Sequence, residues 1–283
     1  MKNKSEFGDI TILALDHPGA HDPKYRARRD EIARLAQLFS TNNQFSGSSS
    51  DIPTVAYTSE EDATWATVVQ KLKPLHAKNV STLHLQAQQK LAIPETHVPQ
   101  LKDLSRKTEN AHGFVLAPTE GLIAPRSFLS ALGHRTMFCT QYIRHASKPE
   151  YTPEPDIVHE VIGHVPAFMD RDMVDFSVQL GKMAKRANDA ELTEIERLYW
   201  YTIEFGLIEE RHEVKAFGAG LLSSIGELNH CLGPDVTRKS FDLKEIIRTP
   251  YDFSMMQNTL FIMPSFTHVR KKAMEHFKHL LSP

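Results

Sequence analysis

The chain has 283 residues and a net charge of −2, with 41% hydrophobic and 24% charged residues. Acidic and basic residues are interleaved, so neither nucleic acid nor an anionic membrane is expected as the main partner. No apolar run reaches the roughly 18 residues that span a bilayer, and the polar start lacks a signal core, which predicts a cytoplasmic protein. The two cysteines, Cys139 and Cys231, are too few for a disulfide framework.

The N-terminal part of the chain predicts helices joined by polar loops. Residues 16–19 (DHPG) indicate a turn, and apolar residues at three- and four-residue spacing predict a helix over 23–39. Small polar residues at 40–53 indicate a linker within one domain, because the segment before them is too short to bury a core. Acidic residues after Thr58 indicate the start of a helix that we expect to end at Pro74. Two further helices are predicted over 81–92 and 99–110.

The rest of the chain predicts short strands among further helices. Glycines and prolines at 113–126 indicate a structured loop or short strands, and the glycines of 206–222 indicate a hairpin or loop. Strands are predicted over 136–142 and 260–263, and helices over 127–132, 157–165, 173–187, 192–205, 266–281 and from Ser223 or Ser224 towards Cys231. Helix predominates, which predicts a single, mainly α domain with a few short strands.

The stretch at 155–164, PDIVHEVIGH, places two imidazoles and a carboxylate on an apolar segment. Neutral imidazole is the commonest metal ligand in proteins. His159 and His164 are five residues apart, so a regular helix would place their rings about 140° apart, unlike the four-residue spacing of the zinc protease motif. Both rings can reach one ion only if the helix ends or bulges between them, which Gly163 makes cheaper. A third ligand must come from elsewhere in the chain.

Glu204 is the candidate third ligand, as a lone carboxylate in the apolar and aromatic run LYWYTIEFGL (198–207). Burying an unpaired carboxylate is costly, so this group should be neutralised, ion-paired or bound to a metal. Two histidines and one carboxylate form the facial triad of non-haem Fe(II) oxygenases. Glu160, beside His159, is a second candidate that is better placed to hold a water or a cofactor. On the residues alone, a chance HxxxxH pair and a Glu204 paired with Arg or Lys stay open.

Several segments resemble the pterin-dependent aromatic amino acid hydroxylases. The motifs that carry the resemblance are DHPG (16–19), YRARR (25–29), TQYIRH (140–145), YTPEPDIVHE (151–160), GHVP (163–166), YW (199–200), EFGL (204–207) and GAGLLSS (218–224). They cover nearly the whole chain in the family's order. The resemblance implies the catalytic-domain fold of that family over residues 16–283, after a tail of residues 1–15. Because animal members carry a regulatory domain and a long tetramerising helix that are not expected here, we expect a monomer or weak dimer.

The resemblance implies that His159, His164 and Glu204 hold Fe(II), with tetrahydrobiopterin as a two-electron donor and O2 as co-substrate. It also implies that Arg144 binds the carboxylate of an amino acid substrate, for which a planar guanidinium fork is suited. The other substrate-binding residues that it implies are Thr152 and Ser223 near this carboxylate, Pro155 and Trp200 as walls of the ring pocket, and Phe253. Ser223 is also expected to orient a His ligand. The pterin-binding residues that it implies are Leu122, Ile123, Phe128, Glu160 and Tyr199, and Glu160 is also the catalytic candidate.

Two positions near the pterin side chain depart from the family pattern. Pro125 stands where relatives commonly have a small hydroxyl residue, and Glu196 where they commonly have alanine, so the exact pterin stays open. For the substrate, the resemblance favours phenylalanine or tyrosine over tryptophan, because tryptophan hydroxylases tend to carry Phe at the position of Trp200. Phe253 falls where relatives distinguish phenylalanine from tyrosine with an aliphatic or an acidic residue, and it is neither. Its bulk favours an apolar substrate, which is phenylalanine.

We therefore expect an enzyme that hydroxylates L-phenylalanine to L-tyrosine. Tyrosine or tryptophan hydroxylation is the alternative within the same family. Two alternatives come from other classes, a zinc hydrolase built on His159, Glu160 and His164 and a non-catalytic ligand-binding module. The five-residue spacing of the histidines counts against the hydrolase.

Overall fold

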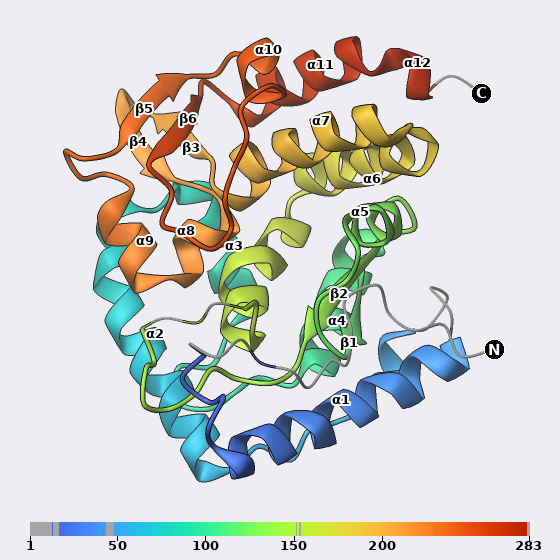
Figure 1. The fold of residues 1–283 in the computed structure, drawn as a ribbon, viewed down its shortest axis with the longest axis vertical. Helices are drawn as coiled ribbons and strands as arrows, with labels where there is room; N and C mark the ends of the chain where they lie inside the picture. The colour runs from blue at the N-terminus through green and yellow to red at the C-terminus, as the bar shows by residue number, and fades with distance from the viewer. Residues whose placement is uncertain (1–12, 14–16, 44–47, 151, 153, 282–283) are drawn as a thin grey trace.

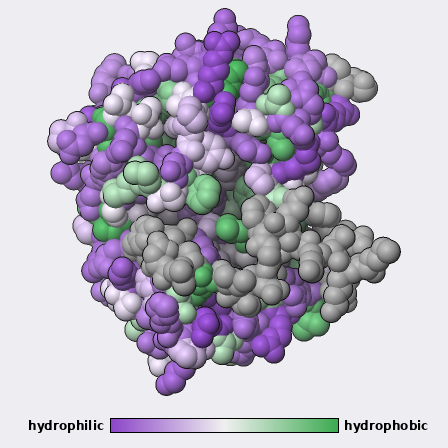
Figure 2. Space-filling view, in the orientation of Figure 1, coloured by the Kyte–Doolittle hydropathy of each residue, from purple (hydrophilic) through white to green (hydrophobic). Residues whose placement is uncertain are grey.

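A computed structural model describes residues 13, 17–43, 48–150, 152 and 154–281 of the chain. Helices predominate and the strands are short, which confirms the expected mainly α architecture (Figure 1). Most of the predicted tail, residues 1–15, lies outside the described residues. Within the described residues, no helix is both long enough and apolar enough to cross a membrane. Figure 2 shows a mainly hydrophilic face on which hydrophobic residues are scattered.

The helices frame a central segment, residues 157–169, which is yellow-green in Figure 1. The α-helices are α1 (Pro23–Asn43), α2 (Ser59–Asn79), α3 (Thr82–Leu91), α4 (Leu101–His112), α5 (Pro125–Leu132), α6 (Arg171–Arg186), α7 (Asp189–Tyr199), α8 (Ala219–Ser223), α9 (Ile225–His230), α10 (Leu243–Ile246), α11 (Phe266–His276) and α12 (Lys278–Leu281). There are also two short 3₁₀-helices, η1 (Ser49–Asp51) and η3 (Val165–Met169), and two short π-helices, η2 (His159–His164) and η4 (Trp200–Glu204).

Two small sheets accompany the helices. The strands are β1 (Val115–Thr119), β2 (Thr136–Thr140), β3 (Leu207–Glu210), β4 (Glu213–Ala216), β5 (Thr237–Ser240) and β6 (Thr259–Met263). β1 and β2 form a parallel pair, and the other sheet has the order β4-β3-β6-β5, with an antiparallel β3–β4 hairpin and parallel pairs on either side of β6. The hairpin confirms one of the two expectations for residues 206–222.

Packing overrides one sequence signal in α2. Thr58 caps this helix as expected, because its side chain accepts a hydrogen bond from the N–H of Glu61 while the Glu61 carboxylate accepts one from the N–H of Thr58. The expected end of the helix at Pro74 is wrong, since α2 continues beyond it. A proline inside a helix removes the hydrogen bond of its own N–H. The buried side chains of Leu72 and His76 on either side keep this turn packed against the core.

Two polar elements of the C-terminal part were not predicted. β5 reads TRKS, has mostly exposed residues and lies at the edge of its sheet, so its sequence lacks the alternation of apolar residues that marks a strand. α10 has only four residues, too few for a helical periodicity to show. The terminal helix predicted over 266–281 is interrupted at Phe277, which separates α11 from α12.

Helix α5 packs on α6 at two glycines. A Cβ atom added to Gly181 would lie 2.0 Å from the backbone nitrogen of Gly133, so the two backbones approach more closely than any side chain permits. This contact sets the position of α5, which carries Phe128.

Gly181→Ala should therefore lower the free energy of unfolding by about 1–3 kcal/mol, because α5 and α6 must move apart to accept the methyl group. Gly226→Ala is the matched control, since the nearest atom to its added Cβ is 3.8 Å away on the exposed side of α9. This control should be neutral or stabilising by up to ~1 kcal/mol. Urea unfolding followed by circular dichroism measures both, and a Gly181→Ala protein as stable as the wild type would contradict the close contact.

Candidate metal centre

The segment that carries the two candidate histidine ligands is a π-helix, η2, rather than a regular α-helix. The N–H of Val165 donates to the carbonyl of Glu160, five residues back. Because a π-turn closes between residues i and i+5, side chains five residues apart point to the same side. The Nε2 atoms of His159 and His164 accordingly lie 3.1 Å apart. The expectation that the helix must bulge between them is confirmed.

Two residues explain why the chain adopts this turn. Pro166 has no N–H, so the carbonyl of Ile162 cannot accept the hydrogen bond that an α-helix would give it. Gly163 faces α8, where a Cβ on it would lie 2.7 Å from the carbonyl oxygen of Ala219. Among the described glycines, only Gly113 has a positive φ. Gly163 is thus required for close approach to α8, and not for the backbone freedom that the sequence suggested.

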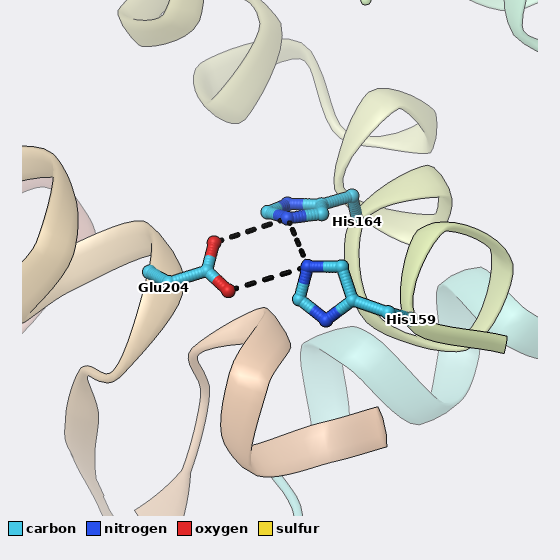
Figure 3. A group of neighbouring side chains, drawn as sticks. All are labelled: His159, His164 and Glu204. Atoms are coloured by element: carbon cyan, nitrogen blue, oxygen red, sulfur yellow. Dashed lines mark hydrogen bonds and ion pairs between the residues drawn. The ribbon is translucent and has the colours of Figure 1, made fainter. Parts of the chain in front are cut away.

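A second π-turn, η4, follows α7 directly and ends at the candidate carboxylate. The helix predicted over 192–205 therefore changes its hydrogen-bond pattern at Trp200, whose carbonyl accepts from the N–H of Phe205 at 2.7 Å. This turn directs the carboxylate of Glu204 towards η2, as Figure 3 shows.

The three side chains converge on one point (Figure 3). The Glu204 Oε1 and Oε2 atoms lie 3.3 Å from His159 Nε2 and 3.1 Å from His164 Nε2. All candidate ligand atoms are within 4.8 Å of one another, and within the described residues this is the group of His, Cys, Asp and Glu side chains that meets this criterion.

Ser223 sets the orientation of the first histidine. Its hydroxyl donates to the carbonyl of Ala219 at 2.8 Å, and a hydroxyl has only one hydrogen to donate. It must then accept from Nδ1 of His159, which is 3.0 Å away. The network therefore assigns the proton to Nδ1 and leaves the lone pair of Nε2 facing Glu204 and His164.

The buried surroundings set the charges of this group. Burial lowers the pKa of His159 to about 4, so its ring is neutral near pH 7. Burial alone would raise the pKa of Glu204, but the adjacent His164 and His159 outweigh it and lower the pKa, which keeps the carboxylate ionised. Imidazole nitrogens and an ionised carboxylate are the donors that divalent transition metals such as iron and zinc accept. The residues present therefore fit a metal ion.

Glu160 lies beside this group without joining it. Its Oε1 accepts hydrogen bonds from the N–H and the hydroxyl of Thr140, both at 3.2 Å, at the end of β2. Burial raises the pKa of Glu160 to about 7. Of the two candidate carboxylates, Glu204 lies in the group with both histidines and Glu160 does not. The catalytic role expected for Glu160 stays a prediction.

Arg144, the expected carboxylate-binding residue, is buried in an ion pair with Asp156. Its Nε and Nη2 donate to the two carboxylate oxygens at 2.9 and 2.8 Å, and Nη1 donates to the Pro149 carbonyl at 3.2 Å. Burial would raise the pKa of Asp156, but Arg144 outweighs it and lowers the pKa. The Asp156 Oδ1 also accepts from the N–H of His159 at 3.0 Å. One carboxylate thus connects Arg144 to the start of η2.

Asp156 was not predicted as a functional residue, although its place in the sequence carries a signal. An Asp directly before an apolar helical run is the pattern of an N-cap residue, whose side chain accepts from the N–H three residues on. Ser223 was expected to lie near the substrate carboxylate and also to orient a His ligand, and the structure places its hydroxyl 3.0 Å from Nδ1 of His159.

The predicted walls of the ring pocket lie on separate segments. Trp200 stacks on Tyr251 with ring centroids 4.1 Å apart, and its Nε1 donates to Oε1 of Gln257 at 3.1 Å. Neither partner was predicted, because both lie in a loop without periodicity. Phe253, expected to contact the substrate, is 78% exposed on this loop. The remaining substrate candidates, Thr152 and Pro155, are half-buried on the segment before η2.

Two of the predicted pterin-binding residues, Phe128 and Tyr199, form a row of ring contacts that ends at the metal-ligand candidate His164. Phe128 contacts Tyr199 edge to face with centroids 5.7 Å apart, and Tyr199 stacks on His164 at 6.4 Å. Leu122 and Ile123 lie in the loop before α5, Leu122 being 57% exposed and Ile123 half-buried. The two departures from the family pattern lie on the neighbouring helices, Pro125 at the first position of α5 and Glu196, half-buried, on α7.

The chain matches a protein-family model, individual proteins of known activity and solved structures. A family model described as biopterin-dependent aromatic amino acid hydroxylase matches residues 7–283. The chain is 42% identical over 275 residues to tyrosine 3-monooxygenase of Homo sapiens, covering 96% of this chain and 51% of that protein. It is 40% identical over 264 residues to phenylalanine-4-hydroxylase of Rattus norvegicus, covering 92% and 57%. The chain thus spans about half the length of the curated relatives that it matches.

Solved structures of bacterial phenylalanine hydroxylases share the fold. The enzyme of Chromobacterium violaceum with bound iron(III) and 7,8-dihydrobiopterin matches with a TM-score of 0.75 and 32% identity over 80% of this chain and 83% of that one. The cold-active enzyme of Colwellia psychrerythraea 34H, an apo structure, matches with a TM-score of 0.75 and 28% identity over 80% and 88%.

Adding Co(II) or Fe(II) at roughly 100 times its Kd should raise the free energy of unfolding by about 2.7 kcal/mol, since the metal binds the folded state alone. Glu204→Gln keeps the shape of the side chain but removes its charge, so most of this stabilisation should disappear. Glu160→Gln is the matched control and should keep it. Thermal denaturation with and without metal measures the difference, and the reverse result for the two variants would contradict the assignment of Glu204.

Proposed function

This chain belongs to the biopterin-dependent aromatic amino acid hydroxylases, and we propose that it hydroxylates the ring of L-phenylalanine to give L-tyrosine. O2 is the oxidant and tetrahydrobiopterin the two-electron donor in this proposal. The observation that carries it is the convergence of His159, His164 and Glu204 on one point.

We assign Fe(II) to these three side chains. Two imidazole nitrogens and one carboxylate on one side of an ion leave its other positions open, which is the arrangement of non-haem iron oxygenases. Bound iron and pterin would together supply the activation of O2. The role of the chain is to hold the ligands in place through Ser223 and Asp156. Buried apolar side chains next to the ligands in the chain, such as Val161, Ile162 and Ile203, help to keep water out.

Arg144 is proposed to bind the substrate carboxylate. A guanidinium has five N–H groups, and the ion pair with Asp156 and the bond to Pro149 use three of them. One N–H on each Nη atom is left to donate to a second carboxylate. Because Asp156 also binds the N–H of His159, it fixes the distance between the bound amino acid and the metal.

The aromatic residues around Trp200 support phenylalanine as the substrate. The Nε1 of Trp200 is already bonded to Gln257, so the indole presents an apolar face and no free N–H to a phenol. Phenylalanine hydroxylases are also among the matching structures. The second candidate is tyrosine hydroxylation, which the 42% identity to human tyrosine 3-monooxygenase favours.

The pterin is proposed to lie near Phe128 and Tyr199, whose rings lead to His164. An aromatic face can stack on a flat bicyclic cofactor. Leu122 and Ile123 would face its edge with backbone groups, and Glu160 lies on the metal side.

Purified protein supplied with Fe(II), tetrahydrobiopterin and O2 should convert L-phenylalanine to L-tyrosine with the highest kcat/KM among the three aromatic amino acids. Product analysis by chromatography and mass spectrometry identifies the hydroxylated ring. A higher kcat/KM for tyrosine or tryptophan would refute the assignment of the substrate while leaving the family unchanged.

The ratio of kcat/KM for two substrates, one with and one without a carboxylate, separates the binding role of Arg144 from its contribution to stability. The wild type should prefer phenylalanine to phenethylamine, which lacks the carboxylate. Arg144→Lys keeps the charge but loses the fork, so the ratio of the two kcat/KM values should fall by about tenfold or more. Arg126→Lys is the control, because Arg126 binds the carbonyls of Ala184 and Ala187 at the end of α6. An Arg144→Lys protein with the wild-type ratio would exclude Arg144 from carboxylate binding.

A further inference from the structure

Two buried histidines that are not part of the candidate metal centre lie next to α8 and η2. His76 on α2 and His84 on α3 are each 6% exposed, and their rings meet edge to face with centroids 6.2 Å apart. Burial lowers the pKa of both, to about 3 for His84, so both rings are neutral near pH 7.

His76 forms one short hydrogen bond to the backbone of α8. Its Nε2 lies 2.7 Å from the carbonyl oxygen of Leu222. A carbonyl only accepts hydrogen bonds, so Nε2 of His76 carries the proton and donates it. Leu222 is next to the last residue of α8, and carbonyls at the end of a helix have no partner within the helix. The His76 side chain supplies that partner.

The residue after Leu222 is Ser223, which orients the first metal ligand. α8 has only five residues and its first residue is preceded by Gly218, which has no side chain to cap the helix. Such a short helix does not hold its own position. The bond from His76 therefore fixes α8 at the end where the Ser223 hydroxyl accepts from Nδ1 of His159.

His84 supports the same arrangement from the neighbouring helix. Its ring packs edge to face on His76 and lines the same small cavity as Gly163 and His164 of η2. The two histidines thus lie beside both backbone segments, α8 and η2, that meet at His159.

We propose that His76 is a positioning residue for the metal centre, acting through the carbonyl of Leu222 and the hydroxyl of Ser223 on the ring of His159. The proposal rests on the proposed function only in that His159, His164 and Glu204 bind the metal. Side chains that orient a metal ligand in this way commonly change metal affinity by about 10- to 100-fold when they are removed.

The test uses two replacements of His76 in the full chain, with Co(II) as the probe. His76→Leu removes the donor, and the Kd for Co(II) should rise by about 10- to 100-fold with a shift of its visible absorption bands. His76→Gln can place an N–H near the position of Nε2 and should restore both values to within a few-fold of the wild type. If His76→Leu does not fold, His76→Asn replaces it, because its amide is too short to reach the carbonyl.

Thr108→Val is the matched control for a loss of packing. The buried hydroxyl of Thr108 donates to the carbonyl of Phe114 at 2.7 Å, so this variant also removes a side chain to carbonyl bond from the core. It should lower the thermal midpoint as His76→Leu does, yet bind Co(II) like the wild type. In a Ser223→Ala background, His76→Leu should have little further effect on the Kd, since both act through the same contact.

An unchanged Kd and spectrum in His76→Leu, or an equal loss of affinity in Thr108→Val, would overturn the proposal and leave His76 as an ordinary core residue. Additive effects of His76→Leu and Ser223→Ala would overturn the path through Ser223. A wild-type protein that does not bind Co(II) through His159 would instead refute the proposed function, and the positioning role with it.

Discussion

The metal centre depends on a shift of one residue in a backbone hydrogen-bond pattern. In a regular helix, His159 and His164 would point about 140° apart and could not share an ion. The i to i+5 turn of η2 brings their Nε2 atoms to 3.1 Å from each other, and a second such turn delivers Glu204. π-turns are rare within helices and frequently lie at functional sites. Here the close approach of Gly163 to α8 and the missing N–H of Pro166 favour the wider turn.

A set of buried polar contacts then converts this backbone geometry into an oriented site. Ser223 fixes the tautomer of His159, and Asp156 binds both the N–H of that residue and the guanidinium of Arg144. A buried ion pair is not in itself a source of stability, because the desolvation of both charges opposes their attraction. Its value here is geometric, since it connects the proposed substrate-binding group to the first metal ligand by a single side chain.

The residues of the triad could be predicted from the sequence because their chemistry stands out against apolar runs. The five-residue spacing also required the helix to end or bulge at η2 if both histidines share an ion. The turn at η4 could not be predicted, since a change from i+4 to i+5 bonding leaves no mark on hydrophobic periodicity. The helix ends show the same limit: Thr58 was a reliable start, whereas Pro74 failed as an end because packing around Leu72 outweighs one lost hydrogen bond. Phe253 was assigned from resemblance alone, and its exposure on the loop after Tyr251 could not be derived from its residue type.

The most direct test of this account is the position of the metal. Crystals of the protein loaded with Fe(II) without oxygen, measured at the iron absorption edge, should show one anomalous peak. The account predicts contacts from this peak to Nε2 of His159, Nε2 of His164 and the carboxylate of Glu204, with Nδ1 of His159 still bonded to Ser223. A peak bound by Glu160 in place of Glu204, or one that contacts only one of the two histidines, would contradict it.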